Sequence, residues 1–265
     1  MNFTKMHGCA NDYVYIECLS GEPKNIPALA VRLSDRHTGV GGDGIVLICA
    51  SNTADFKMRM FNADGSEGAM CGNAIRCVGK YVHDRGFTDK TELEIETLSG
   101  VKRLSMSLEN GAVSSVTVNM GAPEIKTELG TLKALGNTVE YTDISMGNPH
   151  CVIFVSGVEH MDIEPVGREI ENMLSLFPDR TNVEFVELID SHTIRMRVWE
   201  RGSGETMACG TGACASAAAA ILRGFCKSDA PITVRLNGGE LKIEWKNDIF
   251  MTGPAEFVFD GSIDA

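Results

Sequence analysis

Short stretches in which apolar and polar residues alternate make up most of the chain. Alternation of this kind, as in TIRMRVW at 193–199, is typical of a β-strand that buries one face and exposes the other. Turn-forming residues separate these stretches at close intervals. The pattern predicts strands at 12–18, 44–49, 56–61, 92–97, 102–108, 114–119, 151–155, 183–188, 193–199, 232–236, 241–245 and 249–252.

Helical periodicity is sparser and is confined to four segments. It predicts helices near 27–36, 72–85, 165–176 and 210–223. The strands dominate, and the helices do not alternate with them one by one. The pattern therefore favours an α+β fold with mainly antiparallel sheet over a doubly wound parallel sheet.

The chain repeats itself at a spacing of 138 residues. A shift by that distance places Cys71-Gly72 on Cys209-Gly210, and both pairs lie between a glycine-rich turn and a predicted helix. The other matched positions are Glu67 on Glu205, Arg85-Gly86-Phe87 on Arg223-Gly224-Phe225 and, at a spacing of 137, Asn11 on Asn148. We expect two pseudo-symmetric halves, 1–117 completed by 255–265 and 118–254, each a sheet with one main helix.

Each repeated cysteine directly precedes a predicted helix. The positive end of the helix macrodipole favours a thiolate, which predicts a lowered pKa for Cys71 and Cys209. The first N–H groups of a helix have no partner within it and can bind a carboxylate. Here they belong to Gly72 and Asn73 in one half and to Gly210 and Thr211 in the other. One Cys-Gly pair is a weak signal, but two at equivalent positions indicate a functional pair.

Two cysteines on opposite faces of one carbon can invert its configuration. One removes the α-proton of an amino acid, and the other returns a proton from the opposite side. The α-proton is far less acidic than a thiol, so the developing charge needs hydrogen bonds from the helix ends, each worth roughly 3–4 kcal/mol in comparable oxyanion holes. No lysine-centred pyridoxal motif is evident. The sequence thus predicts an amino-acid racemase or epimerase that needs no cofactor.

Composition narrows the function classes further. A net charge of −12 over 265 residues argues against binding to nucleic acid or to an anionic membrane, because phosphate binding requires clustered Lys and Arg. The N-terminal residues show no signal-peptide pattern, and no apolar stretch is long enough to span a bilayer. Nine cysteines without a C-x-x-C pair favour reduced thiols over disulfides or a zinc site. We expect a cytoplasmic protein without a bound metal.

Seven motifs resemble the diaminopimelate epimerase family in order and spacing. They are MHGCAND at 6–12, NADGS at 62–66, CGN at 71–73, GNPH at 147–150, Asn182, ERG at 200–202 and ACGTG at 208–212. The similarity runs from residue 1 to about residue 255. The combination is specific, because Gly-Asn-Pro-His and Glu-Arg-Gly accompany both cysteines.

The resemblance implies roles for individual residues. Cys71 and Cys209 match the family's two acid/base thiols. The backbone cradle for the reacting carboxylate matches Gly72, Asn73, Gly210 and Thr211, and the residues that hold the amino groups and the distal carboxylate match Asn11, Asn62, Asn148, Asn182, Glu200 and Arg201. The resemblance also implies interconversion of LL- and meso-diaminopimelate in lysine and peptidoglycan precursor biosynthesis, a sheet wrapped around a central helix in each half, and a homodimer.

Three departures from the family pattern leave the substrate open. Cys9-Ala10 stands where an apolar residue and glycine are more common, Ala74-Ile75 replaces glycine-alanine, and Gly44 replaces a glutamine that contacts substrate in some members. A racemase of another amino acid is therefore the near alternative. A non-enzymatic thiol or metal-binding protein is an alternative from a different class.

Several site residues also have an ordinary structural interpretation. His150 is expected either next to the substrate or as a hydrogen-bonded turn residue after Asn-Pro. Arg201 is also compatible with a solvated surface position, and the asparagines with common turn positions. Glu67 and Glu205 are expected to cap turns rather than to act on substrate.

Overall fold

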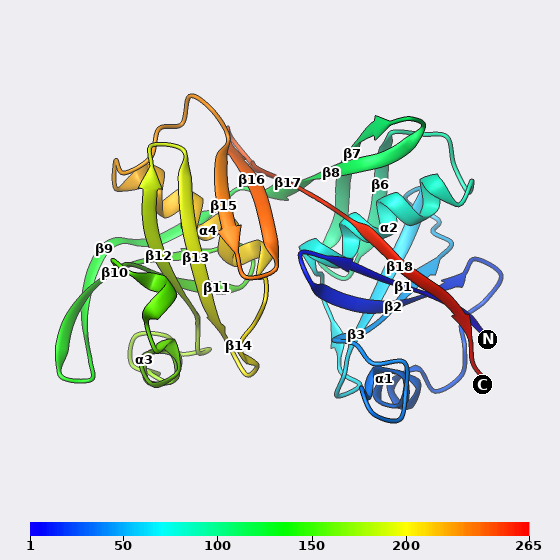
Figure 1. Cartoon of the computed structure of the whole chain (residues 1–265), viewed down its shortest axis with the longest axis horizontal. Coiled ribbons are helices and arrows are strands. Elements are labelled where there is room, and N and C mark those ends of the chain that lie inside the picture. Colours follow the sequence, from blue (N-terminus) through cyan, green and yellow to red (C-terminus); the bar gives the residue numbers. More distant parts are fainter. Residues whose placement is uncertain (265) are drawn as a thin grey trace. The chain divides into compact units, whose positions relative to one another are not determined.

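The computed structural model describes residues 1–264 and divides into two compact units. Unit 1 comprises Met1–Asn119 and the chain from Gly253 onward, and unit 2 comprises Met120–Thr252 (Figure 1). The sequence places its predicted boundaries after residues 117 and 254. That the two halves are separate folding domains stays a prediction.

Unit 1 is a curved sheet with two helices. Its elements are β1 (Asn2–Gly8), β2 (Asn11–Cys18), α1 (Ile26–Ser34), β3 (Gly44–Cys49), β4 (Phe56–Asn62), β5 (Glu67–Gly68), α2 (Gly72–Asp84), β6 (Glu92–Thr97), β7 (Gly100–Glu109), β8 (Ala112–Gly121) and β18 (Glu256–Ser262). Neighbouring strands follow the order β18–β1–β2–β3–β4–β6–β7–β8, and β5 pairs with β4. The pairs β2–β3 and β4–β6 are parallel, each joined through a helix, and the other pairs are antiparallel.

Unit 2 repeats this plan. Its elements are β9 (Glu124–Ala134), β10 (Asn137–Ser145), β11 (Pro149–Phe154), the 3-10 helix η1 (Val158–His160), α3 (Ile163–Glu171), β12 (Asn182–Asp190), β13 (Thr193–Glu200), β14 (Gly204–Glu205), α4 (Gly210–Leu222), β15 (Ile232–Leu236), β16 (Gly239–Trp245) and β17 (Ile249–Gly253). The strand order is β9–β10–β11–β12–β13–β15–β16–β17, with β11–β12 and β13–β15 parallel. The parallel pairs occupy the same places as in unit 1, so the repeat extends to the topology.

A central helix fills the concave side of each sheet. All residues of α2 from Gly72 through Val82 are buried, as are all residues of α4 from Gly212 through Ala220. The sequence of α4 is rich in alanine, which has the highest helix propensity and lets strands approach closely. A helix that is apolar all round is stable only when it is enclosed. The predicted α+β fold, with a sheet wrapped around a helix in each half, is confirmed.

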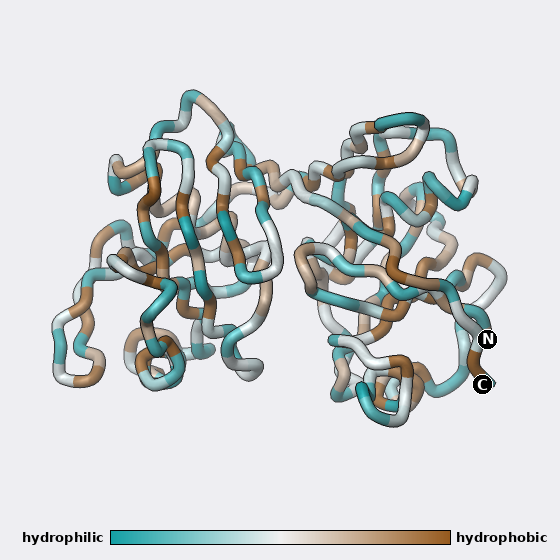
Figure 2. Tube along the Cα trace, viewed as in Figure 1, coloured by the Kyte–Doolittle hydropathy of each residue, from teal (hydrophilic) through white to brown (hydrophobic). Residues whose placement is uncertain are grey.

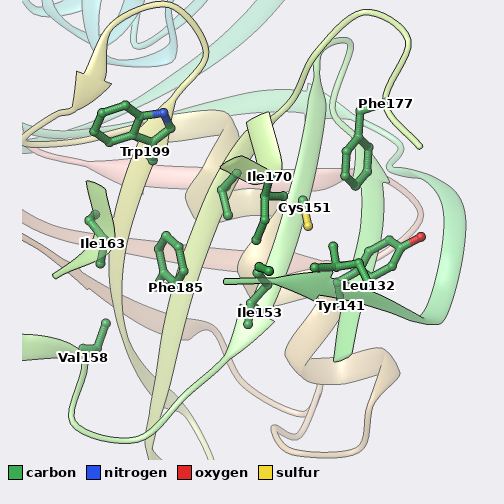
Figure 3. Close-up of a cluster of buried hydrophobic side chains, with 12 residues drawn as sticks. Leu132, Tyr141, Cys151, Ile153, Val158, Ile163, Ile170, Phe177, Phe185 and Trp199 are labelled. Atoms are coloured by element: carbon green, nitrogen blue, oxygen red, sulfur yellow. The ribbon is translucent and has the colours of Figure 1, made fainter. Parts of the chain in front are cut away.

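The other face of the unit 2 sheet packs on α3 (Figure 3). The side chains of this cluster include Cys151, Ile153, Val183, Phe185, Trp199, Ile163 and Ile170. Hydrophobic and hydrophilic residues alternate along β12 and β13 in Figure 2, as expected for strands with two different faces. Successive side chains point to opposite faces, so His150 and Glu184, which lie between the cluster positions, face α4.

Six strands of the described residues were missed in the sequence. Four are long, β1, β9, β10 and β18, and two are the two-residue strands β5 and β14. The strands β9 and β10 form a hairpin around Leu135 and Gly136, whose φ values of 47° and 78° are left-handed. Most positions of β9 are exposed or half-buried, so the strand carries little of the apolar alternation on which the prediction rested.

Two helix ends were also misplaced. Helix α1 ends at Ser34 instead of residue 36, because Asp35 is extended and its carboxylate accepts the N–H groups of His37 and Thr38 at 2.8 and 2.6 Å. Helix α3 ends at Glu171 instead of residue 176, after which the chain forms tight turns. Within residues 1–264, no helix has the length and apolar character that crossing a bilayer requires.

Candidate active site

Cys71 caps the N-terminus of α2 in unit 1. Its backbone is extended (φ −133°, ψ 121°), and its sulfur accepts a hydrogen bond from the N–H of Ala74 at 3.5 Å. The thiol donates to Oδ1 of Asn11 at 3.3 Å, and Nδ2 of Asn73 donates to the same oxygen at 3.4 Å. The structure thus brings together the predicted cysteine, the start of its helix and two of the predicted asparagines. We call this group the unit 1 half-site.

Two charged residues, a half-exposed aspartate and a buried arginine, hold these asparagines in place. Nδ2 of Asn11 donates to Oδ2 of Asp43 at 2.7 Å. The fully buried guanidinium of Arg76 donates to Oδ1 of Asn73 at 2.9 Å and to the carbonyl oxygen of Gly72 at 3.0 Å. Buried arginine requires such partners, because an unpaired charge in the interior is costly. Arg76 and Asp43 were not among the predicted site residues, although Arg76 follows Cys71 by little more than one helical turn.

Tyr13 is a further member of this half-site that sequence reasoning missed. Its side chain is buried, and its hydroxyl is hydrogen-bonded to Asn11 and to Cys71. Burial, followed by the negative charges of the Cys71 thiolate and of Asp43, raises the pKa of Tyr13 well above its usual value. Tyr13 therefore stays protonated and presents a hydroxyl next to the sulfur. It lies in the apolar run from Tyr13 to Ile16, all of whose residues are buried, so the sequence alone does not distinguish it from a core residue.

Asn62 lies at the end of β4, paired across the sheet with Gly44. Its side-chain nitrogen donates to Oγ of Ser66 at 3.0 Å, which closes the glycine-rich turn before Cys71. A Cβ at Gly44 would lie 2.0 Å from the carbonyl oxygen of Phe61 and 2.9 Å from Cε1 of Tyr13. This backbone has no room for the glutamine that some family members carry at that position.

Cys209 occupies the equivalent position in unit 2, as the N-cap of α4. Its backbone is extended (φ −119°, ψ 110°), and its sulfur accepts a hydrogen bond from the N–H of Gly212 at 3.3 Å. Oγ1 of Thr211 lies 3.5 Å from the sulfur. Both predicted thiols thus sit at helix N-termini, three residues before the N–H that binds them. Cys209 and its neighbours form the unit 2 half-site.

The predicted lowering of the cysteine pKa is wrong for Cys209. Burial, and then the negative charges of Glu200 and Glu184, raise its pKa well above the usual value. The hydrogen bonds from Thr211 and Gly212 act in the opposite direction but do not outweigh these effects. The helix-end argument omitted desolvation, which for a side chain only 6% exposed is the larger effect. Cys209 therefore rests as a neutral thiol.

Behind Cys209 lies a buried histidine–carboxylate pair. Nδ1 of His150 is 2.6 Å from Oε1 of Glu184, and both side chains are fully buried. Nε2 of His150 is 3.1 Å from Oδ1 of Asn148, whose Nδ2 donates to Oγ1 of Thr211 at 3.2 Å. His150 is therefore a fully hydrogen-bonded residue of β11 inside the half-site. Glu184 was not predicted, because a glutamate in an alternating strand looks like a solvated position.

The remaining predicted residues of unit 2 lie around the turn before Cys209. Nδ2 of Asn182 donates to the carbonyl oxygen of Pro149 at 2.8 Å, and its Oδ1 accepts the backbone N–H of Arg201 at 2.9 Å. The exposed guanidinium of Arg201 donates to the carbonyl oxygen of Asp179 at 2.7 Å. The hydroxyl of Thr206 donates to Glu200. Asn182 thus fixes the backbone that carries Arg201, and the arginine head remains accessible.

One group of side chains has the donor types of a metal site. Among residues 1–264, the ligand atoms of His150, Glu184 and Cys209 lie within 4.8 Å of one another. Nδ1 of His150 and Oε1 of Glu184 are already hydrogen-bonded to each other at 2.6 Å. An ion bound by these two atoms would have to displace the proton between them. The expectation that the site works without a metal stays a prediction.

Solved structures share this architecture over the whole chain. A PhzF-family phenazine biosynthesis protein from Bacillus anthracis superposes with a TM-score of 0.81 at 16% sequence identity, covering 100% of this chain and 99% of that one. A hydroxyproline epimerase from Agrobacterium vitis gives a TM-score of 0.73 at 16% identity, covering 98% and 91%. The chain therefore has the fold shared by the phenazine biosynthesis PhzF proteins, the proline racemases and the diaminopimelate epimerases.

Sequence comparison is more specific. The family described as Diaminopimelate epimerase matches residues 3–126 and 142–258. Proteins named diaminopimelate epimerase from Methanococcus maripaludis strain C5 and from Acetivibrio thermocellus are 51% and 50% identical to this chain; the alignments cover 100% of this chain and 100% and 99% of those proteins. The chain belongs to the diaminopimelate epimerase family, and it is an isomerase. The resemblance found in the motifs is confirmed.

Proposed function

We propose that this enzyme interconverts LL- and meso-diaminopimelate without a cofactor, with Cys71 and Cys209 as its acid and base. The observation that carries the proposal is the equivalence of the two half-sites. Each holds a thiol at the N-cap of a central helix, with its sulfur hydrogen-bonded to the N–H three residues on. The similarity to proteins named diaminopimelate epimerase, over the full chain, supports the choice of substrate.

The chemistry requires one thiolate and one thiol on opposite faces of the α-carbon. The thiolate removes the α-proton, and the thiol delivers a proton from the other side. Its raised pKa keeps Cys209 protonated and suits it to donate a proton. In the direction in which Cys209 donates, we assign removal of the α-proton to Cys71. The N–H groups at the starts of α2 and α4 then bind the substrate carboxylate and stabilise the charge that develops as the proton leaves.

Side chains around the two cysteines supply contacts for a substrate with two zwitterionic heads. We assign Asn11, Asn62, Asn148, Asn182, Glu200 and Arg201 to the amino groups and the distal carboxylate. Carboxamides can accept from an ammonium group and donate to a carboxylate, and a guanidinium can bind a carboxylate through two parallel hydrogen bonds. The exposed head of Arg201 is consistent with binding the distal carboxylate.

An α-proton exchange assay tests this function. We would incubate the enzyme in heavy water with LL-diaminopimelate, meso-diaminopimelate and a panel of monocarboxylic amino acids, and follow deuterium at the α-carbon by NMR. Exchange with inversion only for diaminopimelate is expected. Exchange of another amino acid alone would identify a different racemase, and no exchange with any substrate would favour a non-enzymatic role.

Three wider expectations accompany this proposal. The reaction would serve lysine and peptidoglycan precursor biosynthesis, the enzyme would be cytoplasmic, and the active form would be a homodimer. Growth of a deletion strain with and without diaminopimelate tests the pathway. Light scattering at working concentration tests the dimer.

A further inference from the structure

A continuous chain of hydrogen bonds leads from a buried carboxylate to the sulfur of Cys209. It passes from Glu184 to His150, then to Asn148, then to Thr211 and finally to the sulfur, with successive distances of 2.6, 3.1, 3.2 and 3.5 Å. All five residues belong to unit 2. The first two are fully buried, so water does not compete for their hydrogen bonds.

The direction of each hydrogen bond follows from its partners. Oδ1 of Asn148 can only accept, so Nε2 of His150 carries a hydrogen. The 2.6 Å contact between Nδ1 and Glu184 then needs one further proton, whether that proton resides on nitrogen or on oxygen. Within residues 1–264 the other oxygen of Glu184, Oε2, has no hydrogen-bond partner. The hydrogen bond between histidine and glutamate therefore fixes the imidazole orientation.

The same reasoning sets the direction of the threonine hydroxyl. Because Oδ1 of Asn148 faces His150, its Nδ2 faces Thr211 and donates to Oγ1. A hydroxyl has one hydrogen, and this hydroxyl already accepts from Asn148, so its hydrogen is available for the sulfur of Cys209 at 3.5 Å. The sulfur then has two donors, the Thr211 hydroxyl and the Gly212 N–H.

We propose that Glu184 is a positioning residue that, through His150 and Asn148, keeps the hydroxyl hydrogen of Thr211 directed at the sulfur of Cys209. The role goes beyond packing. The charged groups around this sulfur are Glu200 and Glu184, with His150 behind them, and the two carboxylates oppose the thiolate. A directed hydroxyl offsets part of that opposition and makes the deprotonated form of Cys209 accessible when the reaction runs in reverse. The catalytic meaning rests on the proposed function, whereas the arrangement of the hydrogen bonds does not.

Glycine at position 212 is part of the same arrangement. A Cβ there would lie 2.7 Å from Oε1 of Glu184 and 3.2 Å from the sulfur of Cys209. The carboxylate and the sulfur thus both lie where a side chain at position 212 would have to go. Any larger side chain would push Glu184 away from His150 or the sulfur away from its donors.

Two substitutions at Glu184 separate positioning from charge. Glu184→Gln and Glu184→Met both remove the carboxylate, but only glutamine can donate to Nδ1 of His150 and keep the hydrogen on Nε2. The readout is the pH dependence of Cys209 alkylation by iodoacetamide, followed by peptide mass mapping in a Cys71→Ala background. We expect the thiol of the methionine variant to titrate about 0.5–1 pH unit higher than that of the glutamine variant. Equal profiles in two folded variants would overturn the proposal.

A double-mutant cycle provides an independent test should Glu184→Met not fold. Asn148→Asp keeps the shape of the side chain but offers an acceptor to Thr211, which turns the hydroxyl hydrogen away from the sulfur. We expect Asn148→Asp to raise the pH at which Cys209 titrates. This shift should be smaller in a Thr211→Val background, because only the effect of the added negative charge then remains. If the shifts of the two single variants simply add in the double variant, Asn148 does not act through Thr211, and the proposed chain of hydrogen bonds is contradicted.

These measurements need no epimerisation, so the two proposals fail separately. If Cys209→Ala loses activity while the two Glu184 variants show the same pH dependence of Cys209 alkylation, the proposed function stands and the positioning role of Glu184 is wrong. If the Glu184 variants show the expected titration shifts but Cys209→Ala keeps full activity, the hydrogen-bond chain stands and the proposed function is wrong.

Discussion

Arg197 and Glu205 are joined by two parallel hydrogen bonds, from Nε to Oε1 at 2.8 Å and from Nη2 to Oε2 at 2.9 Å. The pair closes the hairpin of β13 and β14, directly before Cys209. The same pair, 138 residues earlier, is Arg59 with Glu67, at 2.7 and 2.9 Å, before Cys71. Both glutamates were expected to cap turns. They instead bind arginines of the preceding strand and fix the start of the segment that carries each thiol.

The Arg197–Glu205 pair should contribute to stability in a pH-dependent way. The hydrogen bond from Arg197 lowers the pKa of Glu205, so the contribution is present above the unfolded carboxyl pKa of about 4.3 and is lost as the pH falls through the folded value. We expect Glu205→Gln to lower the free energy of unfolding by about 1 kcal/mol at pH 7. Urea unfolding should show this difference disappearing in strongly acid buffer. A difference that persists there would mean that the charge plays no part.

Either cysteine should be indispensable for epimerisation. In the proposed mechanism, Cys71→Ala and Cys209→Ala each remove the acid or base assigned to one face of the carbon, so we expect turnover to fall about 10²- to 10⁴-fold. Thermal unfolding should change little. Cys226→Ala is the matched control, because Cys226 is as buried as Cys209 (5% against 6% exposed) but belongs to neither half-site. A variant at either site that keeps more than about a tenth of wild-type turnover would remove that cysteine from the mechanism.

Binding of the distal carboxylate of the substrate should depend on the planar shape of the Arg201 guanidinium as well as on its charge. Arg201→Lys keeps the charge but loses the planar pair of donors, so KM for diaminopimelate should rise about tenfold or more. The measurement is steady-state kinetics. Arg235 is an exposed arginine of the same unit, so Arg235→Lys is the control for any effect of an Arg-to-Lys change outside the half-sites. An unchanged KM, or a wild-type preference for a monocarboxylic amino acid, would show that the distal assignment is wrong.

The turn before Asn11 carries strain that glycine should relieve. Cys9 and Ala10 form a two-residue connection between β1 and β2 with φ values of 53° and 62°, a region that glycine adopts most readily. We expect Ala10→Gly to raise the free energy of unfolding by about 1 kcal/mol. The matched control is Ala28→Gly in the exposed part of α1, which should lower it by about the same amount. If urea unfolding shows that both variants change the free energy of unfolding in the same direction, the turn is not strained.

The sequence predicted those features of the fold and site that appear in both halves of the chain. It did not predict the properties that depend on which side chains are buried together. The offset of 138 residues located both thiols, both central helices and the two-halves arrangement, because each signal appears twice. Glu184 was missed because a glutamate between apolar strand residues looks solvated, and Tyr13 because a tyrosine in an apolar run looks like a core residue. Only the folded structure shows that both lie next to a cysteine. The pKa of Cys209 was mispredicted for the same reason. Helix position is visible in a sequence, whereas desolvation depends on everything folded around the sulfur.

Oxidation should join the two thiols if they act on one carbon. Inversion requires both sulfurs to reach the same α-carbon, so in the empty enzyme they should come close enough to form a disulfide. Cys71 is half-buried and Cys209 is buried and protonated, so we expect the oxidant diamide to react first at Cys71. Attack by Cys209 on the adduct then releases the reduced hydrazine and leaves a Cys71–Cys209 disulfide, with loss of activity that dithiothreitol reverses.

Substrate protection distinguishes this disulfide from others. In the proposed mechanism the substrate separates the two sulfurs, so diaminopimelate should slow the inactivation. Cys18 and Cys49 are register partners on the parallel strands β2 and β3, and their thiols are hydrogen-bonded, so a cross-link between them is a competing product. Peptide mapping of wild type and of Cys18→Ser resolves the two. Cys18→Ser should lose activity as wild type does, and Cys71→Ala should form only the competing product. Inactivation that substrate does not slow, or a cross-link found only at Cys18 and Cys49, would mean that Cys71 and Cys209 do not face one another across a substrate.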